Sequence, residues 1–231
     1  MTERNKNEAI ILIADPRILA IEIKDNQEEM LDLTLQTAII YGSSPEIPNN
    51  NDYTKLRKTV YERLRQAQSL LPQGFKFCLY EGYRSIKLQK KLFDMRFAKI
   101  AYLHPDWPEE MIFDETIKMV SPVVNKDKSL NIPPHSTGAA FDVYLLNDKG
   151  EAVDMGIHPK DWAHDTEGIV SLTSSDEISN EAKFHRHIMN RALEAVDFVN
   201  YPTEFWHWSY GDRYWAYHKG AANALYGSWE G

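Results

Sequence analysis

The segment YPTEFWHWSYGDRYWAYH, residues 201–218, constrains the fold most because it mixes a run of aromatic residues with ionisable ones. Its eighteen positions hold three Trp and four Tyr, together with Glu204 and His207. Aromatic runs usually form protein core, where a carboxylate or an imidazole needs a hydrogen-bonding partner or a metal ion. The rest of the chain must therefore bring complementary groups to this segment.

The overall composition is that of an ordinary globular protein, and it argues against some classes of partner. The chain has 231 residues, of which 43% are hydrophobic and 26% charged. This length can bury one sizeable core, so we expect a single domain over residues 1–231. The net charge of −8, with no dense Lys/Arg cluster among aromatic residues, argues against a nucleic-acid partner. No apolar stretch is long enough to span a membrane, so we expect no membrane partner.

The single cysteine and the N-terminal segment bear on where the protein works. Cys78 cannot form an intramolecular disulfide, and its apolar surroundings, FKFCLY, predict a buried side chain. The apolar run AIILIA, residues 9–14, is broken by charged residues and a proline at 15–17. It is too short for a secretory signal and is predicted to form a buried strand. If Met1 is the native start, these features favour a cytoplasmic protein.

The periodicity of hydrophobic residues predicts both helices and strands without a regular βαβ alternation. Amphipathic helices are expected at 53–71, 86–103 and 180–199. Strands are expected within 8–40, at 75–83, at 139–146, and as a hairpin around the turn SYGD in 201–218. Asn51 or Asp52 is expected to cap the first helix and Ser85 the second, while 104–134 and 155–180 are interpreted as long loops. We therefore predict an α+β fold with a central, mainly antiparallel sheet flanked by helices.

The motif HSTGAAFD combines a turn and a strand that carry two candidate metal ligands. His135 lies in a turn-like stretch between Pro134 and Gly138, and Asp142 follows inside the apolar strand AAFDVYLL. A carboxylate between apolar neighbours is costly to bury unless it is paired. A chain reversal at residues 136–138 would let His135 and Asp142 approach each other. Nitrogen and oxygen donors of this kind suit Zn²⁺.

His207 is the natural third ligand because it too lies within an apolar strand. Three protein ligands would leave one position of a tetrahedral zinc ion open, as is typical of catalytic sites. On an ideal strand, Glu204 would face the side opposite to His207. Pro202, however, indicates that the strand begins irregularly, so the Glu204 carboxylate could lie beside the metal without binding it. There it could transfer protons. Arg84, in the motif EGYRS, lies where a strand is predicted to end and a helix to begin, and its guanidinium could stabilise an oxyanion.

Each of these residues also has a purely structural interpretation. Asp142 could be a paired core carboxylate, His207 a hydrogen-bonded core histidine, and Arg84 a member of a structural ion pair. Six further histidines have no partner at ligand spacing and are interpreted as surface or structural residues: His104, His158, His164, His185, His187 and His218. From the residues alone, a zinc hydrolase and a zinc-free domain both stay open.

Together, the motifs EGYRS, HSTGAAFDVYL and EFWHW resemble the ordered signatures of the D-alanyl-D-alanine dipeptidases of the VanX type. This family belongs to the zinc DD-peptidases, which include D-Ala-D-Ala carboxypeptidases and share a core with the hedgehog signalling domain. The resemblance covers nearly the whole chain. It implies an α+β fold, a zinc cofactor on His135, Asp142 and His207, Glu204 as general acid and base, and Arg84 at the oxyanion.

The resemblance implies zinc-dependent hydrolysis of the D-alanyl-D-alanine dipeptide to two D-alanines, linked to the turnover of cell-wall peptides. It also implies that Asp161, in the segment MGIHPKDW, binds the free amino group of this small substrate. Two departures from the family pattern, the Pro-Pro pair before His135 and Phe205 after Glu204, could alter which dipeptide fits. Two alternatives stay open: a D,D- or L,D-carboxypeptidase acting on peptidoglycan stem peptides, and a zinc-stabilised binding module without catalysis. The oligomeric state is also left open.

Overall fold

The computed structural model describes residues 10–43, 45 and 51–229. Its strands are β1 (Met30–Asp32), β2 (Ile40–Tyr41), β3 (Lys55–Arg57), β4 (Lys76–Glu81), β5 (Ala140–Leu146), β6 (Val199–Tyr201) and β7 (Glu204–Ser209). Its α-helices are α1 (Pro16–Leu19), α2 (Lys58–Leu70), α3 (Ile86–Leu103), α4 (Glu109–Thr116), α5 (Asn180–Glu194) and α6 (Arg213–Lys219). Its 3₁₀ turns are η1 (Leu33–Leu35), η2 (Asp52–Thr54), η3 (Pro134–Thr137) and η4 (Pro159–His164).

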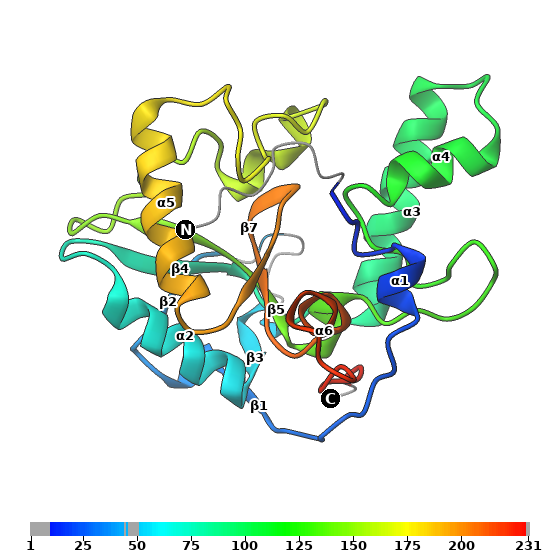
Figure 1. The fold of residues 1–231 in the computed structure, drawn as a ribbon. Helices are drawn as coiled ribbons and strands as arrows, with labels where there is room; N and C mark the ends of the chain where they lie inside the picture. Colours follow the sequence, from blue (N-terminus) through cyan, green and yellow to red (C-terminus); the bar gives the residue numbers. More distant parts are fainter. Residues whose placement is uncertain (1–9, 44, 46–50, 230–231) are drawn as a thin grey trace.

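A five-stranded sheet in the order β2-β4-β5-β7-β6 forms the centre of the fold (Figure 1). Strands β4, β5, β7 and β6 pair antiparallel, whereas the short β2 runs parallel to β4. Strands β1 and β3 form a separate antiparallel pair. The predicted α+β fold with a mainly antiparallel sheet is therefore confirmed.

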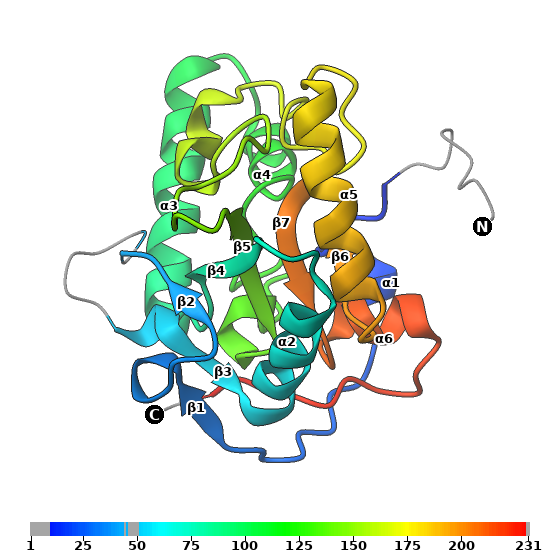
Figure 2. The same ribbon diagram turned by 90° about the vertical axis from the view of Figure 1, so that its left-hand side faces the viewer.

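The two faces of the sheet have different chemistry. Helices α2 and α5 lie together on one face (Figures 1 and 2). Successive side chains of a strand point to opposite faces, and Phe141, Val143 and Leu145 of β5 are fully buried in the core that includes residues of these helices. Asp142 lies between Phe141 and Val143, so its side chain points to the opposite face of the sheet. There it lines a pocket whose walls include α3. One face therefore holds the apolar core, and the other carries ionisable groups.

The strand-to-helix transition that contains Arg84 forms as the sequence predicts. Strand β4 lies within the expected range 75–83, and α3 covers Ile86–Leu103 as expected. The Ser85 hydroxyl accepts a hydrogen bond from the Leu88 N–H at 3.2 Å, which caps the helix. Arg84 is thereby fixed at the junction of two regular elements. The predicted burial of Cys78 in β4 is also confirmed.

Several predictions for the first half of the chain were wrong. Residues 10–14 form no strand, and residue 9 lies outside the described residues. Ile11, Leu12 and Ile13 instead pack, partly buried, in the cluster that contains Tyr201 and Tyr214. The first long helix begins at Lys58 rather than at residue 53, and Asn51 makes no side-chain capping bond. The chain at 55–57 is used for pairing with β1, a long-range contact that outweighs local helix propensity. The expected loop 104–134 contains α4.

Two predictions for the second half also needed correction. The hairpin consists of β6 and β7, and the SYGD turn leads into α6 instead of a further strand. The reason is that the Asp212 carboxylate accepts a hydrogen bond from the Trp215 N–H at 2.7 Å and caps that helix. Helix α5 ends at Glu194, and Phe184, which was expected to face inward, is 53% exposed. Among the described residues, no helix has the length and apolar character to cross a membrane.

Candidate metal centre and its pocket

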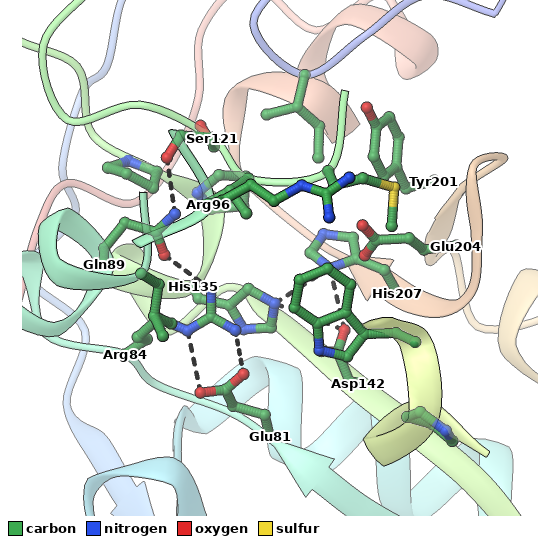
Figure 3. Close-up of a pocket in the computed structure, with 18 of the residues that line it drawn as sticks. Glu81, Arg84, Gln89, Arg96, Ser121, His135, Asp142, Tyr201, Glu204 and His207 are labelled. Carbon is green, nitrogen blue, oxygen red and sulfur yellow. Dashed lines mark hydrogen bonds and ion pairs between the residues drawn. The ribbon is translucent and has the colours of Figure 1, made fainter. Parts of the chain in front are cut away.

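Three candidate ligands from distant parts of the chain meet at the sheet surface. Asp142 of β5 and His207 of β7 are direct cross-strand partners, and η3 brings His135 beside them. The His207 Nδ1 atom lies 3.1 Å from both Asp142 Oδ1 and His135 Nε2, and the last two atoms are 3.5 Å apart (Figure 3). All three side chains are buried. Three donor atoms that converge in this way leave a position where one metal ion can contact all of them.

A hydrogen bond outside the cluster orients the imidazole of His135. His135 Nδ1 lies 2.8 Å from the carbonyl oxygen of Gly82, to which it can donate, so that Nε2 keeps its lone pair for a metal. A Cβ atom at Gly82 would lie 2.6 Å from the Lys55 carbonyl oxygen, so glycine allows this close approach of the backbone. His207 Nε2 is buried and has no hydrogen-bond partner among the described residues.

The donor set fits Zn²⁺. Two imidazole nitrogens and one carboxylate oxygen are typical zinc ligands, and three protein ligands leave a coordination position for water or substrate. The electrostatics of Asp142 agree with its role as a candidate ligand. Burial alone would raise the pKa of Asp142, but His135 and His207 outweigh it and hold that pKa well below its usual value. The Asp142 carboxylate is therefore ionised, as a ligand must be.

Arg84 lies beside the cluster and is held by two buried residues. Its Nε donates to Glu81 Oε1 at 3.0 Å, its Nη2 pairs with the other Glu81 oxygen, and its Nη1 donates to Gln89 Oε1 at 2.9 Å (Figure 3). The Gln89 amide donates in turn to the Ser121 carbonyl oxygen at 2.7 Å. Sequence reasoning missed both Glu81 and Gln89. The signal for Glu81 was available, because this carboxylate, like that of Asp142, lies within an apolar strand.

Glu204 faces the same pocket as His207, although the two residues lie three positions apart on β7. The pairing of β6 and β7 changes register between Asn200 and Tyr201, and Tyr201 is the partner of Glu204. This irregular start explains why the carboxylate does not point to the opposite face. Burial raises the pKa of Glu204 to about 7, with smaller opposing effects from His207 and Arg84. A carboxylate with this pKa can accept and return a proton near neutral pH.

The pocket that contains these groups has a volume of about 270 Å³. Its floor is the sheet, and its walls come from α3, the segment after α4, and η4. Apolar side chains make up much of the walls: Leu92, Met95, Ile117, Met119, Val120 and Trp162. A partly apolar cleft with a few convergent polar groups is the usual form of a small-molecule site.

The remaining predicted residue, Asp161, lies at the edge of this arrangement. It belongs to η4, of which Pro159, Trp162 and Ala163 line the pocket, but Asp161 itself is not a lining residue. Among the histidines that were interpreted as structural, His185 is buried and its Nδ1 lies 2.7 Å from the Asp154 carbonyl oxygen. The metal-ligand cluster found among the described residues contains none of those six histidines.

The raised pKa of Glu204 predicts a pH dependence of stability for the metal-free protein. The unfolded chain ionises Glu204 near its usual pKa of 4.5, whereas the folded protein holds the proton up to about pH 7. Glu204 therefore contributes to the free energy of unfolding in full below pH 4.5, and this contribution is lost as the pH rises through 7. The loss amounts to about 2–3 kcal/mol between pH 5 and 8. Glu204→Gln should remove this loss. Urea unfolding at both pH values, with a chelator present, measures it.

The exposed carboxylate of Glu62 on α2 offers a matched control. Glu62→Gln should keep the wild-type pH dependence, because this exposed side chain lies outside the pocket that holds Glu204. If the free energy of unfolding changed with pH in the same way for Glu204→Gln and for the wild type, the pH dependence could not be assigned to Glu204.

The family model of the D-ala-D-ala dipeptidases matches residues 47–223. A D-alanyl-D-alanine dipeptidase of Synechocystis sp. is 29% identical over 221 aligned residues, with 86% of this chain and 88% of the relative covered. Two solved structures show a weaker likeness. VanYB in complex with D-alanine-D-alanine has 13% identity and a TM-score of 0.45, with 88% of this chain and 93% of VanYB covered. The LdcB LD-carboxypeptidase has 18% identity and a TM-score of 0.36, with coverages of 87% and 77%.

Proposed function

The chain belongs to the D-Ala-D-Ala dipeptidase family, and from this premise we propose that it hydrolyses the free D-alanyl-D-alanine dipeptide to two D-alanines with Zn²⁺ as cofactor. The observation that carries the proposal is the convergence of His135, Asp142 and His207 beside Glu204 in one pocket. In this proposal the first three residues are the zinc ligands. Zinc bound there would polarise the peptide carbonyl and lower the pKa of a water molecule.

Glu204 is proposed to move the protons of the reaction. Its carboxylate takes a proton from the attacking water and returns it to the nitrogen of the departing D-alanine. The apolar surroundings that raise its pKa to about 7 make both directions of transfer accessible near neutral pH. A carboxylate with an ordinary pKa would be a poorer acid for the second transfer.

Arg84 is proposed to stabilise the negative charge that develops on the carbonyl oxygen. Its contacts with Glu81 and Gln89 hold the guanidinium at the pocket before substrate arrives. Preorganised charge of this kind lowers the barrier because little rearrangement is needed in the transition state. Gln89 acts as a positioning residue in this scheme, since it links Arg84 to the Ser121 carbonyl.

The direct test is D-alanine release from D-Ala-D-Ala by the zinc-loaded protein, with an N-acylated dipeptide alongside. Release from the free dipeptide alone supports the dipeptidase. Equal or faster cleavage of the acylated peptide, or of longer stem peptides, would replace it by a D,D- or L,D-carboxypeptidase. Zinc binding without cleavage of any of these would favour a binding module.

A cytoplasmic location stays a prediction, for which detection of the native protein in fractionated cells is the measurement.

The proposed contact between Asp161 and the substrate ammonium gives a further prediction. Asp161→Asn should raise KM for D-Ala-D-Ala about tenfold with little change in kcat, because a partly exposed ion pair contributes modestly to binding. Steady-state kinetics of D-alanine release measures this. Asp148→Asn, in the exposed turn after β5, is the matched control and should leave KM unchanged. An unchanged KM for Asp161→Asn would remove Asp161 from the substrate site.

A further inference from the structure

A second arginine reaches into the pocket and has no place in the proposed chemistry. Arg96 lies on α3, three turns beyond Arg84, and its side chain extends from the helix into the pocket (Figure 3). Its guanidinium carbon lies 5.7 Å from the centre of the Trp162 ring on η4. The side chain therefore extends from the α3 wall toward the η4 wall, across the space that a substrate would enter.

Arg96 lacks an anionic partner within the described part of the chain. No ion pair or hydrogen bond of its guanidinium occurs there, and its Nε atom is buried without a hydrogen-bond partner. Glu115 acts on it only as a charge at a distance, and that carboxylate pairs with Lys118 at 2.6 Å. Burial lowers the pKa of Arg96, as expected for a cation that loses water without gaining a carboxylate.

The comparison with Arg84 shows what Arg96 is missing. Arg84 binds the Glu81 carboxylate through two nitrogens and the Gln89 amide through a third. Arg96 has the same five N–H donors and no such acceptor in the described residues. Lys99, one turn further along α3, also lines the pocket and adds positive charge at its exposed rim. This side of the pocket therefore suits an anion that the described residues do not provide.

We propose that Arg96 binds a carboxylate of the C-terminal residue of the substrate. This inference rests on the proposed function, since a free dipeptide carries such a group at the end opposite to its ammonium. A guanidinium matches a carboxylate with two parallel hydrogen bonds, and apolar side chains, among them Leu92 and Trp162, line the pocket together with Arg96. Arg96 thereby makes the enzyme selective for peptides that end in a free acid within the pocket.

The experiment measures binding separately from catalysis. Glu204→Gln protein loaded with zinc serves as the background, because it keeps the pocket but lacks the proposed base. Calorimetry gives Kd for D-Ala-D-Ala and for its C-terminal amide, with and without the additional change Arg96→Met. We expect Arg96→Met to weaken binding of the acid about 30-fold and binding of the amide less than threefold.

Two further peptides distinguish the possible sources of the carboxylate. D-Ala-D-Glu with an amidated α-carboxyl keeps only its side-chain acid, and D-Ala-D-Gln with the same amide has neither acid. A 30-fold effect of Arg96→Met on the D-Glu peptide, with little effect on D-Ala-D-Ala, would assign Arg96 to a side-chain carboxylate of the C-terminal residue. An effect on D-Ala-D-Ala alone assigns it to the α-carboxylate. Either result supports the inference.

Equal weakening of all four peptides by Arg96→Met would overturn the inference, because a structural role predicts no dependence on the carboxylate. Lys91→Met is the matched control, since it removes a cation from the exposed surface of the same helix. It should leave all four Kd values unchanged. The two proposals can fail separately: a wild-type protein that binds the acid through Arg96 but releases no D-alanine would refute only the proposed function.

Discussion

Replacing Glu204 with glutamine should lower kcat/KM for D-Ala-D-Ala by about a thousandfold while the protein still binds one zinc ion. Glutamine has the same size and can occupy the same place in the pocket, but it cannot accept a proton from water or return one to the leaving amine. General acid–base groups contribute about 10²–10⁴-fold to enzymatic rates, and Glu204 is proposed to act in both directions. D-Alanine release and zinc content, measured on the same preparation, test this.

The control for this experiment must separate chemistry from folding. Glu62→Gln changes the same functional group on the exposed side of α2 and should retain full activity. Metal content and the unfolding transition of Glu204→Gln report whether the site remains assembled. Activity within tenfold of wild type, with zinc bound, would exclude Glu204 as the proton carrier.

Asp142→Asn should have the other large effect, a loss of zinc affinity of at least about a thousandfold together with loss of activity. Asn keeps the shape of the side chain but removes the negative charge that is proposed to bind the metal. In the structure, Asp142 Oδ1 lies 3.1 Å from His207 Nδ1. Zinc binding requires a deprotonated, charged donor set, and the amide oxygen is a much weaker ligand. Competition with a chelator of known affinity measures the change in Kd for zinc.

Asp154→Asn provides the matched replacement of a carboxylate outside the cluster. Its carboxylate accepts hydrogen bonds from the Gly156 N–H and the Ser179 hydroxyl, so its loss affects local stability without touching the pocket. The zinc affinity of Asp154→Asn should equal that of the wild type. If Asp142→Asn bound zinc as tightly as the wild type, Asp142 would not be a ligand.

The sequence predicted the candidate site better than it predicted the secondary structure around it. An aspartate in AAFDVYLL and a histidine in EFWHW are recognisable because burying such groups among apolar neighbours is costly without a partner. Helix α3 was also predictable, because a Ser85 cap and a hydrophobic repeat are local signals. Residues 55–57 were misassigned because their partner strand, β1, lies about 25 residues away and leaves no local trace.

What the sequence determined by itself is therefore which residues are candidates for the site. Asp142 and His207 stand out by the desolvation cost that their apolar neighbours imply, and His135 and Arg84 by the turn and the strand-to-helix junction in which they lie. What only the tertiary structure decided is how they meet. The pairing of Asp142 with His207 depends on the register of β5 and β7, and a shift by one residue would turn one of them away. The surroundings of Arg84 depend in the same way on how α3 packs over the sheet, as does the position of Arg96, which has no anionic partner in the described part of the chain. Contacts between distant segments are set by packing and not by local sequence.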